Sequence, residues 1–263
     1  MSRKKTRDVT RFIILSHGRT GSTALCNGLS MHPRIHAYHE TFHGEFPMRC
    51  AVNGKVFENG TDGGAFCREI IHAEQNEFGK PVIGFKLFFF HAREGEAEYN
   101  VWRHLMADTS VRVIFLLRRN LFDSFVSEQR SKQSGVWSLD PGQKPPETHT
   151  QPIFIDPIEC QIFMERTAAE IAWARRAFAR HTQITMDHAD LQRDFQGSLD
   201  ALCQFLGEEP APVPLTFEKL NTAPHPSGVM NYDDLLRYFQ CSIFRECFIP
   251  ENGTNGTHRP EAD

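Results

Sequence analysis

Short apolar runs alternate with helical patterns along this chain of 263 residues, and this alternation constrains the fold more than any other feature. The runs have the length of strands and several are nearly continuous in apolar residues. They cover residues 11–15, 35–38, 81–88, 111–117 and 183–186. Strands that are apolar on both faces occur in parallel sheets covered by helices on both sides. The sequence therefore predicts an α/β fold with a central, mostly parallel sheet of about five strands flanked by helices.

Two of the helices have clear start signals. Asn120 is a preferred N-cap residue, and Asp123 adds an acidic side chain to the first turn. Asp156 is followed by Pro157, which suits the first helical position, and apolar side chains then recur at helical spacing as far as Phe178. These patterns predict one helix after Asn120 and a longer one, with a core-facing stripe, after Asp156.

The chain shows no composition break that would divide it, so we expect a single domain over residues 11–249. We expect a flexible N-terminus at 1–10 and a disordered tail at 250–263. Residues 134–157 hold five prolines and two glycines without periodicity. A segment of this kind is either disordered or a lid or insert that contacts the substrate.

Composition disfavours several classes of protein. The formal net charge of −4, from 29 basic and 33 acidic residues, does not suit a protein that neutralises nucleic-acid phosphates. No stretch approaches the ~18 apolar residues of a membrane-spanning helix, and the first apolar run is too short for a signal peptide. The seven cysteines are scattered without a Cys-x-x-Cys pair, as is typical of reduced thiols. We therefore expect a cytoplasmic protein with no integral membrane segment; the oligomeric state, a homodimer included, stays open.

A glycine-bearing loop follows the first apolar run and opens a helical pattern. In such a strand–loop–helix unit the backbone N–H groups and the helix dipole attract phosphate, and hydroxyl groups add donors. Arg19 offers a fork of donors for anionic oxygens. The residues expected to bind phosphate are His17, Gly18, Arg19, Thr20, Gly21, Ser22 and Thr23. With a phosphate-binding loop between the first strand and the first helix, the predicted three-layer fold is similar to that of P-loop proteins.

The loop departs from the Walker pattern of ATPases. Ser16 occupies the position of the first glycine and Ser22 that of the lysine, so the lysine that reaches the terminal phosphates is missing. The run at 111–117 ends in arginines and not in a carboxylate that could hold Mg²⁺. These differences favour a nucleotide that is bound without Mg²⁺ and carries an additional anionic group.

A second anion site is indicated where that run ends. Arg119 closes the run, and Ser127 follows eight residues later within the next predicted helix. An arginine and a hydroxyl group near a helix N-terminus suit a phosphomonoester. Taken singly, these residues are more typical of a solvated strand end and a solvated helix face than of an anion site.

Together, the loop and the Arg119–Ser127 segment resemble the two nucleotide motifs of the sulfotransferases, which use 3′-phosphoadenylyl sulfate (PAPS). The resemblance implies that the loop holds the 5′-phosphosulfate and that Arg119 and Ser127 hold the 3′-phosphate. It extends through the Pro-rich segment and the Asp156–Phe178 helix as far as Gly207, and it is greatest to bacterial carbohydrate sulfotransferases of the Nod-factor type. One departure is that the family's Tyr-Glu-Asp-Leu is replaced by the segment Asp187–Leu191.

The resemblance also implies an activity: transfer of a sulfuryl group from PAPS to a hydroxyl of a carbohydrate or glycolipid, with adenosine 3′,5′-bisphosphate as product. Cationic groups should stabilise the developing charge, and Arg19 and Lys86 are the candidates. Glu40 follows a short strand and is the favoured general base, with His91 and His39 as rivals. We expect no metal ion and a small-molecule or glycan acceptor.

Three other functions stay open on the sequence alone. The segment from His39 to His43 matches His-Glu-x-x-His, the zinc-protease motif, which requires a continuous helix. A P-loop nucleotide kinase would need the loop lysine and a metal-holding carboxylate. A PAPS-binding module without catalytic activity would share the nucleotide motifs and show no turnover.

Overall fold

The structure, a computed structural model, describes residues 9–43, 51–58, 61–73, 76–92, 99–139, 142–213 and 228–249. The predicted tail at 250–263 lies outside the described residues, as does all but the end of the predicted flexible N-terminus.

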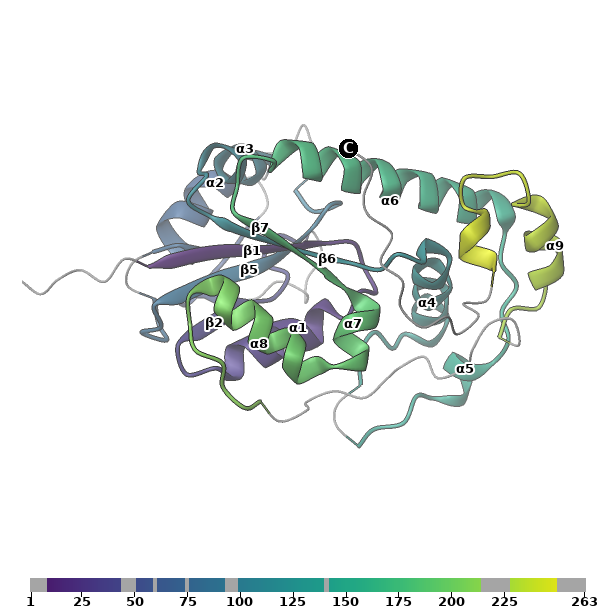
Figure 1. Cartoon of the computed structure of the whole chain (residues 1–263), viewed down its shortest axis with the longest axis horizontal. Helices are drawn as coiled ribbons and strands as arrows, with labels where there is room; N and C mark the ends of the chain where they lie inside the picture. Colours follow the sequence, from purple (N-terminus) through teal and green to yellow (C-terminus); the bar gives the residue numbers. More distant parts are fainter. Residues whose placement is uncertain are drawn as a thin grey trace, which may run out of the picture.

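A five-stranded parallel sheet with the strand order β2-β5-β1-β6-β7 forms the centre of the molecule (Figure 1). Its strands are β1 (Thr10–Ser16), β2 (Ile35–Tyr38), β5 (Val82–Phe88), β6 (Arg112–Leu117) and β7 (Gln183–Asp187). Each of the predicted strands is present within one residue at either end. The predicted α/β architecture is therefore confirmed, and β1 lies in the middle of the sheet.

Alternate side chains of the central strands supply two separate cores. Ile13 and Leu15 of β1 belong to one core, and Phe12 and Ile14 belong to the other. The first core is covered by α2 (Gly63–Phe66), α3 (Asn100–Ala107) and α6 (Pro157–Ala177), and the second by α1 (Ser22–Met31), α7 (His188–Arg193) and α8 (Phe195–Leu206) (Figure 1). This burial on both faces explains why the strand sequences are nearly continuous in apolar residues.

A third apolar cluster joins α4 (Leu121–Ser134) to the first half of α6 and to the segments near residue 240. Both predicted helix starts are confirmed: the Asn120 side chain accepts from the Asp123 N–H, and Asp156 accepts from two N–H groups at the start of α6. The remaining described elements are β3 (Ala51–Val52), β4 (Lys55–Val56), the π-helical turn η1 (Cys67–Ile71), α5 (Glu147–Thr150), α9 (Tyr232–Tyr238) and η3 (Arg245–Phe248). The described part of the Pro-rich segment thus contains a short helix, α5.

Among the helices that the structure describes, none has the combination of length and apolar character needed to cross a bilayer.

Close contact between β5 and β1 predicts the effect of one substitution. Gly84 lies beside Phe12 in the register of these strands, and a Cβ atom at Gly84 would overlap the Phe12 carbonyl oxygen and ring. We predict that Gly84→Ala lowers the free energy of unfolding by about 1–3 kcal/mol, the usual cost of overpacking a core, as measured by urea denaturation. Gly18→Ala is the control, since a Cβ there meets no atom within 4 Å. Equal stability of the two variants would contradict the prediction.

Candidate active site

Polar residues that follow the strands meet at the carboxyl edge of the sheet. The loop after β1 is linked to α4, which follows β6, and to α7, which follows β7. An ion pair between Glu40, which follows β2, and Lys86 of β5 lies beside the same loop, because Lys86 also contacts Thr23. In open parallel sheets this edge is where ligands bind, because the loops leaving neighbouring strands converge there.

The loop between β1 and α1 has the backbone conformation of an anion-binding turn. Arg19 and Gly21 both have positive φ angles, of 66° and 80°, and the Thr20 hydroxyl donates to the His17 carbonyl oxygen at 3.3 Å. A positive φ at a residue other than glycine costs of order 1 kcal/mol, and such residues cluster at functional sites. Gly21 is the N-cap of α1 and has no side chain to satisfy the first amides of that helix. These N–H groups are therefore suited to an anionic ligand.

Two neutral histidines hold this loop through its backbone. His17 Nδ1 donates to the Gly18 carbonyl oxygen at 2.9 Å, and its Nε2 accepts from the Arg118 amide at 3.5 Å. His188 Nδ1 donates to the Thr20 carbonyl oxygen at 2.9 Å. Burial lowers the pKa of each histidine to about 4. His188 was not among the predicted site residues, although its place directly after a strand was a usable signal.

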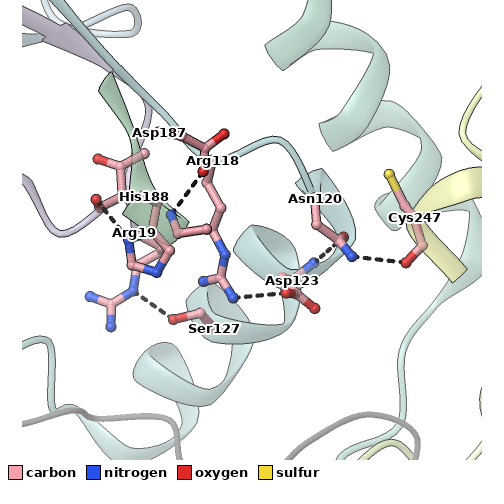
Figure 2. A network of polar contacts seen from close by, with 10 residues as sticks. Arg19, Arg118, Asn120, Asp123, Ser127, Asp187, His188 and Cys247 are labelled. Atoms are coloured by element: carbon pink, nitrogen blue, oxygen red, sulfur yellow. Dashed lines mark hydrogen bonds and ion pairs between the residues drawn. The ribbon is translucent and has the colours of Figure 1, made fainter. Parts of the chain in front are cut away.

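Arg19 connects the loop to α4. Its Nε donates to the Ser127 hydroxyl at 3.0 Å (Figure 2). Its Nη1 donates to the Trp137 carbonyl oxygen at 2.7 Å. Burial, and secondarily the charge of Arg118, lower the pKa of Arg19 to about 10, so the side chain stays cationic at neutral pH. Among the described residues, no carboxylate forms an ion pair with Arg19. The guanidinium group thus has neutral partners and retains its attraction for an anion.

The two arginines after β6 each pair with a carboxylate. Arg118 Nη2 lies 3.0 Å from Asp123 Oδ2, one turn before Ser127 on α4 (Figure 2). Arg119 Nε lies 2.7 Å from Asp187 Oδ2, and the Arg119 side chain is 88% exposed. The sequence predicts Arg119 beside Ser127, whereas the structure places Arg19 on the Ser127 hydroxyl. The counter-ion of Arg119 is thus Asp187, the last residue of β7 and the first of the segment that differs from the family's Tyr-Glu-Asp-Leu.

Lys86 and Glu40 form a buried ion pair. Lys86 Nζ lies 2.7 Å from Glu40 Oε1 and donates to the Thr23 hydroxyl at 3.2 Å. The two residues are only 1% and 9% exposed. Lys86 is therefore buried within the sheet and is not a solvated lysine at a strand edge. The structure brings three predicted site residues together where β2 and β5 meet the first turn of α1.

The zinc-protease interpretation is not supported, because β2 ends at Tyr38 and residues 39–43 form turns and not a helix. The Thr41 amide donates to the His39 carbonyl oxygen, and the His43 amide to that of Glu40. His43 instead packs edge-on against the ring of His91, with ring centroids 5.2 Å apart. Glu40, His43 and His91 offer ligand atoms within 4.8 Å of one another, a set that omits His39.

The two histidines that hold the loop, His17 and His188, predict how the free energy of unfolding depends on pH. Their usual pKa is 6.5 and their folded pKa is about 4, so between these values the unfolded chain binds protons that the folded chain does not. The free energy of unfolding should fall as the pH is lowered through this window, by up to about 1.4 kcal/mol per pH unit for each histidine. His188→Gln, whose amide can still donate to Thr20, should reduce this slope in urea denaturation at several pH values. An unchanged slope would contradict the prediction.

Three solved structures that are similar to this chain are described as sulfotransferases or sulfotransferase domains. A sulfotransferase from Alicyclobacillus acidocaldarius is similar with a TM-score of 0.52 and 16% sequence identity, over 90% of this chain and 93% of that chain. The sulfotransferase domain from the curacin biosynthetic pathway is similar with a TM-score of 0.45 and 14% identity, over 78% of this chain and 76% of that domain. The sulfotransferase domain from the Synechococcus PCC 7002 olefin synthase has a TM-score of 0.40 and 15% identity, over 79% and 78%.

No protein-family model matches the sequence, and no curated protein matches it at a significant level. The likeness to the Alicyclobacillus protein, which spans nearly the whole of both chains, shows that this chain has the fold of a sulfotransferase.

Proposed function

We propose that this chain is a cytoplasmic sulfotransferase that transfers the sulfuryl group of PAPS to a hydroxyl of a carbohydrate or glycolipid. The observation that carries the proposal is the position of Arg19. It is a cation in a left-handed loop conformation, it contacts Ser127 of the second predicted anion site, and its partners among the described residues are neutral. One ligand with an anionic group at each end would satisfy both the loop and α4.

The donor would bind through both motifs. The loop amides at the start of α1 and the Arg19 guanidinium group would hold the 5′-phosphosulfate. Ser127 and Arg119 would hold the 3′-phosphate. Arg119 can turn toward that phosphate because its own side chain is 88% exposed, and Asp187, which is 12% exposed, would keep the hydrogen bond that it accepts from the Ala189 amide.

The buried pair of Lys86 and Glu40 would carry the chemistry. The acceptor oxygen attacks the sulfur atom, the bond from sulfur to the bridging oxygen breaks, and that oxygen stays with adenosine 3′,5′-bisphosphate. Glu40 would take the acceptor proton, and Lys86, which also contacts Thr23 of the phosphate loop, would stabilise the charge that develops on the bridging oxygen. Burial lowers the pKa of His91 well below its usual value, which makes it a weaker base than a histidine in water.

An open pocket of about 600 Å³ supports a bulky acceptor. It is formed by the Pro-rich segment itself, just after the end of α4, and Trp137 and Leu139 contribute to its lining. Trp137 also accepts the hydrogen bond from Arg19 through its carbonyl oxygen, and the Arg19 guanidinium carbon lies 5.7 Å from its ring centroid. An acceptor in this pocket would therefore lie next to the proposed donor site.

Nucleotide binding tests the role of Arg19. We predict that Arg19→Ala weakens the binding of adenosine 3′,5′-bisphosphate by about 10–100-fold, the usual effect of losing charge-assisted hydrogen bonds, as measured by isothermal titration calorimetry. Arg166→Ala is the matched control, because Arg166 is an exposed arginine on α6 that pairs with Glu170. Equal affinity of the two variants would remove Arg19 from the donor site.

Turnover tests the role of Glu40. We predict that Glu40→Gln lowers the transfer of label from radiolabelled PAPS to a panel of sugar and phenol acceptors by about 10²–10⁴-fold, the usual contribution of a general base. Nucleotide affinity should stay unchanged, since the glutamine can still accept from Lys86. The His91→Gln variant should retain turnover. If the His91→Gln variant is inactive and the Glu40→Gln variant is active, His91 and not Glu40 is the general base. A wild-type protein that binds nucleotide and labels no acceptor would be a binding module.

A further inference from the structure

A group of metal-ligating side chains lies outside the candidate active site. The Cys67 sulfur and one ring nitrogen each of His72 and His104 lie within 4.8 Å of one another. Cys67 begins η1, His72 directly follows it, and His104 lies in the last turn of α3. None of these residues takes part in the contacts that build the nucleotide loop or the Lys86–Glu40 pair.

The π-helical turn is what brings the first two ligands together. The His72 amide donates to the Cys67 carbonyl oxygen at 2.8 Å, five residues back along the chain. In an α-helix, residues five apart point in directions that differ by about 140°, whereas the wider π-turn nearly aligns them. Isolated π-turns are rare and occur frequently at functional sites. The π-helical turn thus places a thiol beside an imidazole.

The distance between these two ligands fits a shared metal ion. Cys67 Sγ lies 3.6 Å from His72 Nδ1. At a tetrahedral zinc ion, with bonds of ~2.3 Å to sulfur and ~2.0–2.1 Å to nitrogen, the two ligand atoms lie about 3.6 Å apart. The position between them is enclosed, since Cys67 is 0% and His72 is 2% exposed.

The protonation states of the two histidines also suit the binding of a divalent cation. Burial, with a smaller effect of Arg11, lowers the pKa of His72 to about 3, and burial followed by Arg68 lowers the pKa of His104. Both imidazoles are therefore neutral at neutral pH and have a nitrogen lone pair available. Burial raises the pKa of the Cys67 thiol, so a thiolate there needs a cation to stabilise it.

We propose that Cys67, His72 and His104 bind a Zn²⁺ ion that fastens η1 to α3. The ion replaces the thiol proton of Cys67, which is released to solvent, and two neutral imidazoles complete a three-residue ligand set. Asp108, the residue after α3, contributes a negative charge that acts on all three ligands from outside the cluster, and a water molecule takes the fourth position. The site is structural and independent of the proposed transferase activity.

Cobalt titration of the metal-depleted full-length chain tests the proposal. Co²⁺ bound to a thiolate gives a charge-transfer absorption that the Glu40, His43 and His91 set, which lacks a thiol, does not produce. We expect a saturable band at one ion per chain that Zn²⁺ abolishes. Cys67→Ser should lack the band, and Cys203→Ser, which alters another buried cysteine, should retain it. Zn²⁺ should raise the melting temperature of the wild type and of Cys203→Ser only.

A second variant distinguishes loss of metal binding from loss of folding. His104 is only half-buried, so His104→Gln should fold and still bind adenosine 3′,5′-bisphosphate, while its affinity for Co²⁺ falls at least tenfold. The absence of a thiolate band in the wild type, or an equal band in Cys67→Ser, would overturn the metal site. Neither result would affect the nucleotide measurements on Arg19, so the two proposals fail separately.

Discussion

The candidate site depends on a parallel sheet that is buried on both faces. Such a sheet accepts apolar side chains along its strands and leaves polar side chains a place only where the strands end. Lys86 is a charged and buried exception, since it lies inside β5 with 1% of its surface exposed. An unpaired ammonium group there would cost several kcal/mol, and Glu40, delivered by the end of β2, removes most of that cost. The residues that we propose for catalysis are thus also required by the fold.

In the loop between β1 and α1, Arg19 has both a strained backbone conformation and a charge that its hydrogen-bond partners do not neutralise. Arg19 adopts a left-handed conformation, and the loop around it is held by the imidazoles of His17 and His188, which burial keeps neutral. Arg118, Arg119 and Lys86 each have a carboxylate partner, whereas the contacts of Arg19 are with a hydroxyl and a carbonyl oxygen. An anionic ligand would therefore gain most of its attraction at Arg19, at the junction of the loop with α4.

The strands and the two capped helices could be predicted because their signals are local: continuous apolar runs, and cap residues at fixed spacing. Glu40 and Lys86 were each predicted for the site, but not as an ion pair. They meet because β2 and β5 are neighbours whose register places Tyr38 beside Phe85. The contact of Arg19 with Ser127 could not be predicted, because these residues are 108 positions apart and their contact depends on side-chain rotamers.

The dependence on tertiary contacts also explains why the His-Glu-x-x-His match at residues 39–43 does not form a helix of the zinc-protease type. His-Glu-x-x-His has a chemical meaning only on a helix, and the tertiary pairing of β2 with β5 decides that this segment leaves a strand and turns. The π-turn at η1 has no sequence signature of its own, so the juxtaposition of Cys67 with His72 could be seen only in the structure.

One strand links the two sites. Phe85 and Lys86 are neighbours in β5 and point to opposite faces of the sheet, Lys86 toward Thr23 of α1 and Phe85 into the core beneath α3. The Phe85 ring contacts His72 at a centroid distance of 5.6 Å and Phe42 at the same distance. Phe42 follows Glu40 by two residues and is 2% exposed, so its burial holds the turn that carries the carboxylate. Packing around Phe85 therefore positions Glu40 from one face of the sheet, while α1 positions Lys86 from the other.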